Sequence, residues 1–284
     1  MESQGKRHEW TLGMTRRVEF TGQLRMTSAL HVGGGVGTTS FTDAGVLRHP
    51  DGRPFIPGSS MKGALRSHLE RFAQAPALED TGLTSCLLYP EDPSATSAPE
   101  CPSPGWIEES KDATTAEESD FEQLCHTCTL FGSPILAGKV RVPDLELIRD
   151  TYDGEVEIRD GVGIDRDRGR PVDGIKFDYE VVPSGTAFEF SLSIDSPDSA
   201  ELGLAAIAIR EMQEGRVSVG AQTTRGLGSC VLEHLQVQEA DFSDLSSLET
   251  YLLTRTDGGA APAVDDPDAY LDSCVEALLS GEHA

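Results

Sequence analysis

The sequence has no long apolar run and few aromatic residues. A stretch of about 18 apolar residues, which a membrane-spanning helix needs, occurs nowhere in it. Aromatic residues make up 6% of the chain and all hydrophobic residues 38%. Val, Leu, Ile and Phe nevertheless recur in patterned segments, which excludes a collagen-like or wholly disordered chain. Residues 1–15 are polar and contain no apolar signal region, so we expect a cytoplasmic protein without membrane contact.

Basic residues are also scarce: 23 Lys and Arg stand against 48 Asp and Glu, for a net charge of −25. Such acidity argues against nucleic-acid binding, which needs clustered Lys and Arg. The acids are concentrated, however, in segments 75–124 and 233–284, each with twelve acidic residues and one basic residue. Both segments are rich in Pro, Ser, Thr and Ala, which is typical of solvated insertions and tails. Residues 1–74 carry a net charge of +4, so the part of the chain outside the two acidic segments can still bind RNA.

Hydrophobic periodicity predicts a mixed α+β fold. Alternating patterns predict strands at 17–26, 139–147 and 230–237, and a β-hairpin that joins 177–181 to 188–194. Helical patterns predict one helix from an N-cap at Ser59 or Ser60 through Phe72, and others at 199–213, 245–253 and 266–280. This order favours a ferredoxin-like fold with antiparallel strands and helices on one face.

The same patterns divide the chain into four parts. Residues 1–74 begin the core with a glycine-rich loop and a basic helix, and 75–128 form an acidic insertion. Residues 129–240 complete the core; they include a polar loop or hairpin at 159–176 and an Arg-Gly loop at 220–228. Residues 241–284 are an acidic helical tail.

The glycine-rich loop at 31–37 invites comparison with nucleotide-binding motifs. Thr38 stands where a dinucleotide-binding loop needs glycine, and the sequence contains no Gly-Lys-Ser/Thr, so that loop and a P-loop are both excluded. Backbone N–H groups beside a helix that bears Lys62 and Arg66, one turn apart, can still cradle a phosphate. The alternative is a flexible turn beside a solvated basic helix face.

Several motifs follow the glycine-rich loop in a fixed order. They are Pro57-Gly58-Ser59-Ser60-x-Lys62-Gly63-x-Leu65-Arg66, Leu130-Phe131-Gly132-Ser133, Phe177-Asp178-Tyr179-Glu180-Val181-Val182 and Arg225-Gly226-x-Gly228. In this combination the chain, from about Val18 to Leu235, resembles the RAMP superfamily and, more closely, the backbone subunits of type III CRISPR effector complexes. The resemblance implies an RRM-like RAMP palm within a prokaryotic, cytoplasmic antiviral complex. There, several RAMP subunits, among them further copies of this chain, would stack along a guide crRNA and its complementary target RNA.

The resemblance also implies a projecting thumb hairpin at 159–176 that kinks the guide–target duplex. The palm of such proteins holds guide phosphates and sugars without reading sequence. We therefore expect RNA contacts at His31, Gly33, Gly34, Ser60, Lys62, Arg66, Arg166, Arg168 and Arg225. Because Asp165, Asp167 and Asp173 are interspersed with the thumb arginines, internal ion pairing in a solvated loop is the alternative there.

In the resembling family an acidic residue in the loop after the glycine-rich turn supports metal-dependent cleavage of target RNA. Asp43 stands at that place and is the catalytic candidate, with His49 a nearby candidate general acid or base. One carboxylate can orient Mg²⁺ or Mn²⁺, or a water, beside a scissile phosphate that the RNA 2′-hydroxyl attacks. Alternatively, Asp43 is an ordinary Asx-turn residue and the chain is a non-catalytic RNA-binding scaffold.

Four of the six cysteines lie in or beside the acidic insertion: Cys86, Cys101, Cys125 and Cys128. A tetrahedral Zn²⁺ on four thiolates would close this poorly hydrophobic segment, and some members of the resembling family carry such a site. His126 is a spare ligand. No βαβ pattern surrounds the Cys-x-x-Cys to favour a redox motif, and the cytosolic context disfavours disulfides. Cys230 and Cys274 are expected in the core. A zinc-stabilised protein-interaction module, unrelated to RNA, is a further alternative.

Overall fold

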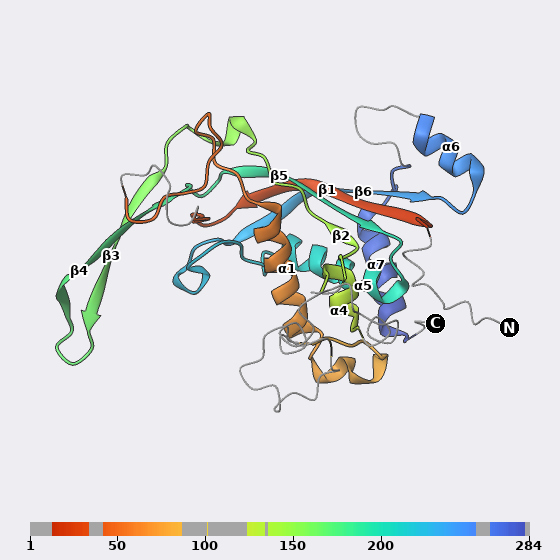
Figure 1. Ribbon diagram of the computed structural model, residues 1–284, viewed down its shortest axis with the longest axis horizontal. Helices are drawn as coiled ribbons and strands as arrows, with labels where there is room; N and C mark the ends of the chain where they lie inside the picture. The colour runs from red at the N-terminus through yellow and green to blue at the C-terminus, as the bar shows by residue number, and fades with distance from the viewer. Residues whose placement is uncertain are drawn as a thin grey trace.

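The main sheet of the protein has the strand order of a ferredoxin-like fold. The structure, a computed structural model, describes residues 13–33, 42–86, 101, 124–133, 136–253 and 262–281 (Figure 1). Four strands form the sheet: β1 (Arg16–Met26), β2 (Val140–Arg141), β5 (Ala187–Asp195) and β6 (Cys230–Asp241). They lie in the order β2-β5-β1-β6, and each neighbouring pair is antiparallel.

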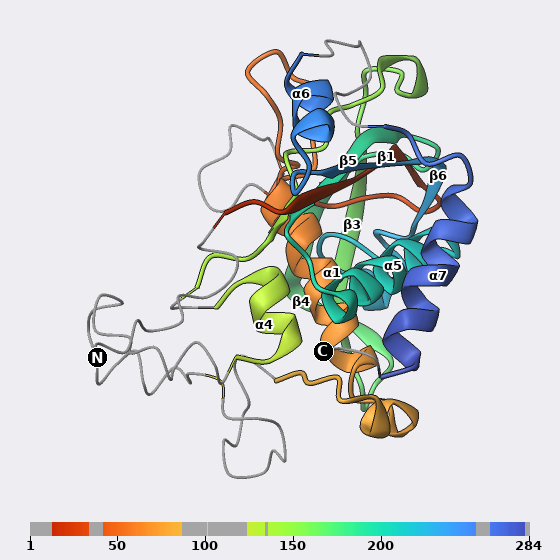
Figure 2. The ribbon, with the colours of Figure 1, turned by 90° about the vertical axis from the view of Figure 1, so that its right-hand side faces the viewer.

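Two helices complete the β-α-β-β-α-β pattern of that fold. α1 (Gly58–Phe72) follows β1, and α5 (Ser199–Gln213) lies between β5 and β6. Both cover the same face of the sheet (Figure 2). β1 buries Val18 and Phe20 toward the helices, because alternate side chains of a strand share a face. The apolar stripe of α1 is Met61, Leu65 and Leu69, spaced four residues apart. The α+β prediction is confirmed.

The C-terminal helix is part of the core. α5 begins with an Asp198–Glu201 capping box, and most of its residues are buried because α7 (Pro267–Leu279) packs against it. Gly203 permits the close approach, since a Cβ there would lie 2.5 Å from Leu278 Cβ. α6 (Leu245–Leu253), which precedes α7, contains no buried residue.

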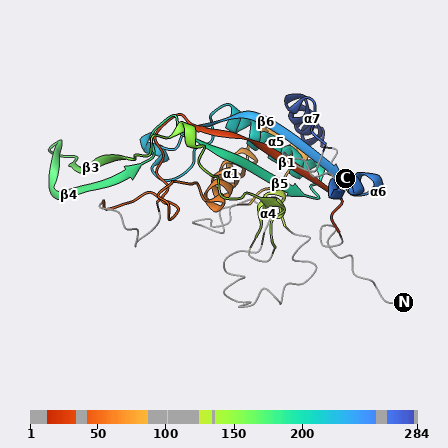
Figure 3. The same ribbon diagram turned by 90° about the horizontal axis from the view of Figure 1, so that it is seen from above.

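A two-stranded hairpin projects away from the sheet (Figures 1 and 3). It consists of the antiparallel strands β3 (Glu157–Asp165) and β4 (Arg170–Val181) and therefore contains the stretch 159–176. The predicted hairpin between 177–181 and 188–194 is wrong. Residues 177–181 pair with β3, whereas β5 pairs with β1 and β2. An alternating pattern fixes which face of a strand is apolar, but it does not choose the neighbouring strand.

Two predicted boundaries also change. The N-cap residue of α1 is Pro57 rather than Ser59 or Ser60, and Pro57 has no side-chain group that can cap the helix. Asp144 performs that task from a distant segment, because its Oδ1 accepts the Gly58 N–H at 2.8 Å. Of the predicted strand 139–147, only Val140–Arg141 pairs as a strand, and single bridges follow at Leu145 and Leu147.

The remaining elements are short. α4 (His126–Phe131) lies between α1 and β2, and 3₁₀ turns occur at Pro76–Thr81, Arg149–Thr151 and Thr223–Arg225. None of the helices in the described ranges is long and apolar enough to cross a membrane.

Candidate metal centre and RNA interface

Four cysteines from distant points of the sequence come together. The Sγ atoms of Cys86, Cys101, Cys125 and Cys128 all lie within 4.8 Å of one another. Cys125 occupies the position before the first residue of α4 and Cys128 lies in its first turn, so the start of the helix brings both sulfurs to one side. Three of the four residues are buried and Cys101 is partly buried. Four clustered cysteines suggest a structural Zn²⁺ site, and the described residues contain no second group of ligands with such geometry.

Hydrogen bonds among the thiols lower the pKa at two of the sulfurs, those of Cys101 and Cys125, and raise it at the other two. The contact with Cys101 is the largest cause in three cases: it holds the pKa of Cys125 far below its ordinary value and raises the pKa of Cys86 and of Cys128. Thiols this close cannot all ionise without a compensating cation. A Zn²⁺ ion would replace their protons and hold them as thiolates, so the donor set fits this metal.

Polar neighbours fix the sulfur positions. The Cys125 N–H donates to Cys101 Sγ at 3.2 Å, and Thr127 Oγ1 lies 3.2 Å from Cys125 Sγ. His126, the spare ligand, is directed elsewhere: its Nδ1 accepts the Thr84 N–H at 3.0 Å. Among the residues that the structure describes, cysteine sulfurs alone therefore make up the candidate metal centre.

The two basic side chains expected to cradle phosphate on α1 already have protein partners. Lys62 Nζ donates to the Val140 carbonyl at 2.7 Å, and burial lowers the pKa of Lys62. The Arg66 guanidinium is directed at the cysteine cluster and donates to Cys128 Sγ at 3.3 Å. Ser60, in the first turn of the same helix, is partly buried. Their RNA contacts stay predictions, but neither cation is held on an open helix face.

The glycine-rich loop, the end of β4 and the 220–228 loop meet at His31. This residue is 5% exposed, its Nδ1 lies 2.7 Å from the Glu180 carbonyl oxygen, and its ring meets Tyr179 edge-on. On the other side, the Ala221 N–H donates to the His31 carbonyl at 2.8 Å. Gly220 permits this contact, because its φ is +90° and a Cβ there would lie 2.4 Å from the same oxygen. His31 is thus a buried anchor that fixes three backbone segments.

Two other expected RNA contacts border this junction. Gly33 is exposed and forms an isolated bridge with Val46. Arg225 is exposed at the end of its 3₁₀ turn, where Gly226 continues the chain with φ +86°. Gly34 lies outside the described residues. An exposed backbone segment and an exposed cation therefore flank the buried His31.

Asp43 is exposed beside the base of the hairpin. Its N–H donates to Asp178 Oδ1 at 2.9 Å, and the Asp178 N–H donates back to Asp43 Oδ2 at 3.1 Å. The next residue, Ala44, forms a parallel bridge with Tyr179, so this segment runs beside β4. Each of the two carboxylates keeps one oxygen that is not used in the reciprocal pair. Asp178 belongs to the 177–182 motif, but the sequence alone predicts no role for it.

Glu180 secures the same segment farther along. Its Oε2 accepts hydrogen bonds from the Val46 N–H at 3.0 Å and from Arg48 Nη2 at 2.7 Å. Asp178 and Glu180 are two residues apart and therefore lie on one face of β4. This spacing is the feature of the sequence from which their shared role in holding the 43–48 segment could have been predicted. His49, the candidate acid or base, faces Glu146 at 3.1 Å and stacks on Phe55.

The arginines near the hairpin tip are exposed. Asp165 Oδ1 accepts the N–H groups of Asp167 and Arg168, which shapes the turn. The ion pairs found on the described hairpin join Arg159 to Glu157 and Lys176 to Asp160, and none involves Arg166 or Arg168. The tip therefore presents cations to solvent.

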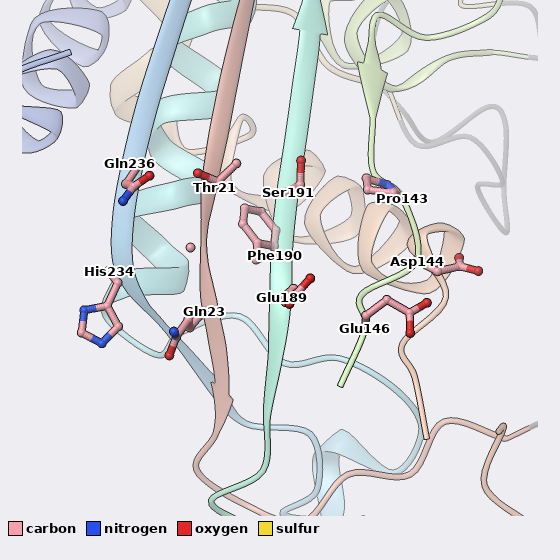
Figure 4. A pocket seen from close by; sticks show the side chains of 11 residues that line it. Thr21, Gln23, Pro143, Asp144, Glu146, Glu189, Phe190, Ser191, His234 and Gln236 are labelled. Carbon is pink, nitrogen blue, oxygen red and sulfur yellow. The ribbon is translucent and has the colours of Figure 1, made fainter. Parts of the chain in front are cut away.

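The sheet face opposite the helices carries a polar groove of about 410 Å³ (Figure 4). Three carboxylates line it, from Asp144, Glu146 and Glu189, together with His234. His234 has φ +55° at an irregularity in the pairing of β6 with β1, opposite Gly22. Carboxylates repel phosphate, so this groove is poorly suited to an RNA backbone.

Comparison with known proteins agrees with this architecture. The sequence matches the family model of the RAMP superfamily over residues 23–231, more than half of the chain. The match spans the cysteine cluster, the projecting hairpin and the junction around His31. A search of curated proteins gives no match. The chain therefore belongs to the RAMP superfamily and is a CRISPR-associated RNA-binding protein.

Proposed function

We propose that the protein is a backbone subunit of a type III CRISPR effector complex, which binds guide crRNA and cleaves the complementary target RNA. One observation carries the proposal: segments 30–33, 43–48, 178–182 and 220–228 are neighbours in space. A Leu30–Val182 bridge, the Ala44–Tyr179 bridge and the hydrogen bond at His31 join them. The glycine-rich loop, the Asp43 segment and the 177–182 and 225–228 motifs thus adjoin one another near the base of the hairpin, which supports a single RNA-binding surface.

Guide binding on this surface would use backbone groups and few cations. Gly33, and Gly34 next to it in sequence, offer N–H groups without side chains, and Arg225 offers an exposed guanidinium. Such contacts hold phosphates and sugars without reading base sequence, as a subunit that accepts any guide requires. Ser60 adds a hydroxyl near the start of α1. Lys62 and Arg66, which donate to the Val140 carbonyl and to Cys128, would add positive charge on α1.

The hairpin and the cysteine cluster would serve the assembly. Arg166 and Arg168 at the hairpin tip would contact the backbone of the guide–target duplex, either the part bound by this subunit or the part bound by a neighbouring subunit. Further RAMP subunits, among them copies of this chain, would continue the surface along the guide. Zn²⁺ on the four cysteines would hold Cys86 and Cys101 of the inserted segment beside the start of α4.

Target cleavage would depend on Asp43. With RNA bound, the 2′-hydroxyl oxygen attacks the adjacent phosphorus and the 5′-oxygen leaves, so the products carry a 2′,3′-cyclic phosphate and a 5′-hydroxyl. The Asp43 oxygen not used in the pair with Asp178 is available to orient a hydrated Mg²⁺ or Mn²⁺ beside that phosphate. The ion would supply charge stabilisation, while the paired RNA and the fixed 42–48 segment supply the geometry.

The sharpest test uses Asp43→Asn beside Asp43→Ala in a guide-loaded complex with labelled complementary RNA and Mg²⁺. Asparagine keeps an oxygen that can accept the Asp178 N–H, so the segment stays in place while the negative charge is lost. We expect both variants to bind target and to lose the regularly spaced products seen with the wild type. Asp178→Asn, which likewise keeps an acceptor, is the matched control and should still cleave. Unchanged cleavage by Asp43→Asn would refute the catalytic role.

A non-catalytic scaffold of the same complex is the second candidate. It is favoured by the reciprocal hydrogen bonds between Asp43 and Asp178, which alone would explain an aspartate at this position. Under this alternative, wild type and Asp43→Asn give the same result on the gel, and the nuclease lies in another subunit. A protein-interaction module unrelated to RNA does not agree with RAMP membership.

A further inference from the structure

Arg66 joins three parts of the protein through one guanidinium. Its Nε donates to Glu70 Oε1 at 2.7 Å, its Nη1 to the Gly132 carbonyl at 2.5 Å, and its Nη2 to Cys128 Sγ at 3.3 Å. The side chain is 15% exposed and that of Glu70 13%. A largely buried guanidinium whose nitrogens all donate to the protein is held in one orientation, and here that orientation faces the candidate metal centre.

The contacts connect α1 with both ends of α4. Cys128 lies in the first turn of α4, whereas Gly132 follows its last residue and has φ +99°. The carbonyl of Gly132 is an acceptor that helix geometry leaves without a partner, and Arg66 supplies the donor. Glu70, one turn after Arg66 on α1, completes the arrangement as an i, i+4 ion pair. Movement of Arg66 would therefore release the helix that carries two of the four cysteines.

Charge gives Arg66 a second role. A Zn²⁺ ion with four thiolates carries a net charge of −2, and burial makes uncompensated charge costly. The guanidinium places a positive charge and an N–H donor on one of the sulfurs. Hydrogen bonds to thiolates stabilise them, as the Cys125 N–H does for Cys101 Sγ. Loss of an outer-shell hydrogen-bond partner of this kind ordinarily weakens metal affinity by about 10–100-fold.

We propose that Arg66 is a positioning residue of the zinc site: it orients Cys128 and Gly132, offsets thiolate charge and thereby couples zinc binding to the docking of α4 on α1. The proposal rests on the zinc site under the proposed function, but not on RNA binding. It gives Arg66 a different task from the guide contact that its sequence motif predicts.

The test measures Zn²⁺ affinity of the full chain by competition with a chromophoric chelator. Arg66→Met should weaken binding by about 10–100-fold, and Arg66→Lys by less, because lysine keeps the charge but cannot serve three acceptors. Arg71→Ala is the matched control, since Arg71 is exposed on the same helix and its one hydrogen bond within the described residues goes to the Ser67 carbonyl. It should leave Zn²⁺ affinity unchanged.

A second variant guards against simple misfolding. Arg66→Met leaves Glu70 buried without its partner, so the double variant Arg66→Met/Glu70→Met removes both charges together. The proposal requires weakened Zn²⁺ binding in this variant as well, with circular dichroism unchanged. The Co²⁺-loaded protein gives an independent readout: loss of the hydrogen bond makes Cys128 a stronger electron donor, so the thiolate-to-Co²⁺ band should move to lower energy.

The outcomes separate the two hypotheses. Zn²⁺ affinity within twofold of wild type in both Met variants, with an unshifted Co²⁺ band, overturns the role of Arg66. If guide RNA binding falls at saturating Zn²⁺ while Zn²⁺ affinity is kept, Arg66 is a guide contact and the proposal is again overturned. If the wild type binds no Zn²⁺, the zinc site and the inference fail together, whereas target cleavage by the guide-loaded complex is tested separately.

Discussion

Two glycines in the motif around α1 have opposite surroundings, and this difference makes a sharp test. Gly58 is buried, and a Cβ there would lie 2.0 Å from the Val142 carbonyl oxygen and 2.7 Å from that of Pro143. Contacts under 3.0 Å are essentially never seen for a real Cβ, so backbone would have to move by about 1 Å. Gly63, five residues later, is exposed, and no atom of the described residues lies within 4 Å of a Cβ there.

The expected effects of alanine have opposite signs. Gly58→Ala forces two packed backbone segments apart, which costs about 1–3 kcal/mol by analogy with overpacked cores. It also strains the Gly58 N–H bond to Asp144, the cap of α1. Gly63→Ala relieves only the entropic cost of a mid-helix glycine and should stabilise the protein by about 0.5–1 kcal/mol.

Thermal and urea unfolding of the zinc-loaded chain measure both changes. Each kcal/mol corresponds to roughly 2–4 °C in Tm for large domains, so we expect a fall of several degrees for Gly58→Ala and a small rise for Gly63→Ala. The urea m-value should not change, because neither variant alters the surface exposed on unfolding. Wild-type stability in Gly58→Ala, or a destabilised Gly63→Ala, would refute the packing account.

Gly63 also bears on RNA binding. Since no neighbour in the part of the chain that the structure describes requires a glycine there, an approaching RNA backbone is a reason for its presence. We expect Gly63→Ala to weaken guide binding while it stabilises the fold. Full guide affinity in this variant would mean that RNA does not approach α1 at this turn.

The remaining predictions concern the core and its pH dependence. Leu278→Ala should lose about 2–5 kcal/mol in urea unfolding, because Leu278 is fully buried against Gly203. Leu279→Ala is the control: Leu279 is 51% exposed, so a comparable loss there would contradict the packing of α7. Burial raises the pKa of Cys230 from 9.0 to about 12, so the folded state keeps the thiol proton after the unfolded chain has lost it. Stability from this group is complete below pH 9 and declines as pH rises toward 12. The urea midpoint of Cys230→Ala should therefore fall less between pH 9 and pH 12 than that of the wild type. Equal pH profiles of the two proteins would refute the role of the Cys230 thiol.

The sequence by itself determined the elements whose signals are local. It predicted α5 at 199–213 and α6 at 245–253 with the observed bounds, because apolar spacing and helix ends depend on neighbouring residues. It also singled out the four cysteines, since few arrangements satisfy that many thiols in a poorly apolar segment. The order of motifs led to the RAMP superfamily, whose family model matches residues 23–231.

Only the tertiary structure decided which segments meet and where charged side chains point. β4 pairs with β3 rather than β5, although the alternating pattern suits either partner. The sequence predicts that Lys62 and Arg66 lie one turn apart on α1 and cradle a phosphate, with a solvated basic face as the alternative. In the structure Lys62 donates to the Val140 carbonyl and Arg66 to Cys128 Sγ. Asp178 lies beside Asp43 because β4 runs along the 42–48 segment, a contact between distant segments that the sequence does not predict. Periodicity specifies the face that a residue occupies, whereas its partners depend on contacts between segments far apart in sequence, which a local pattern does not encode.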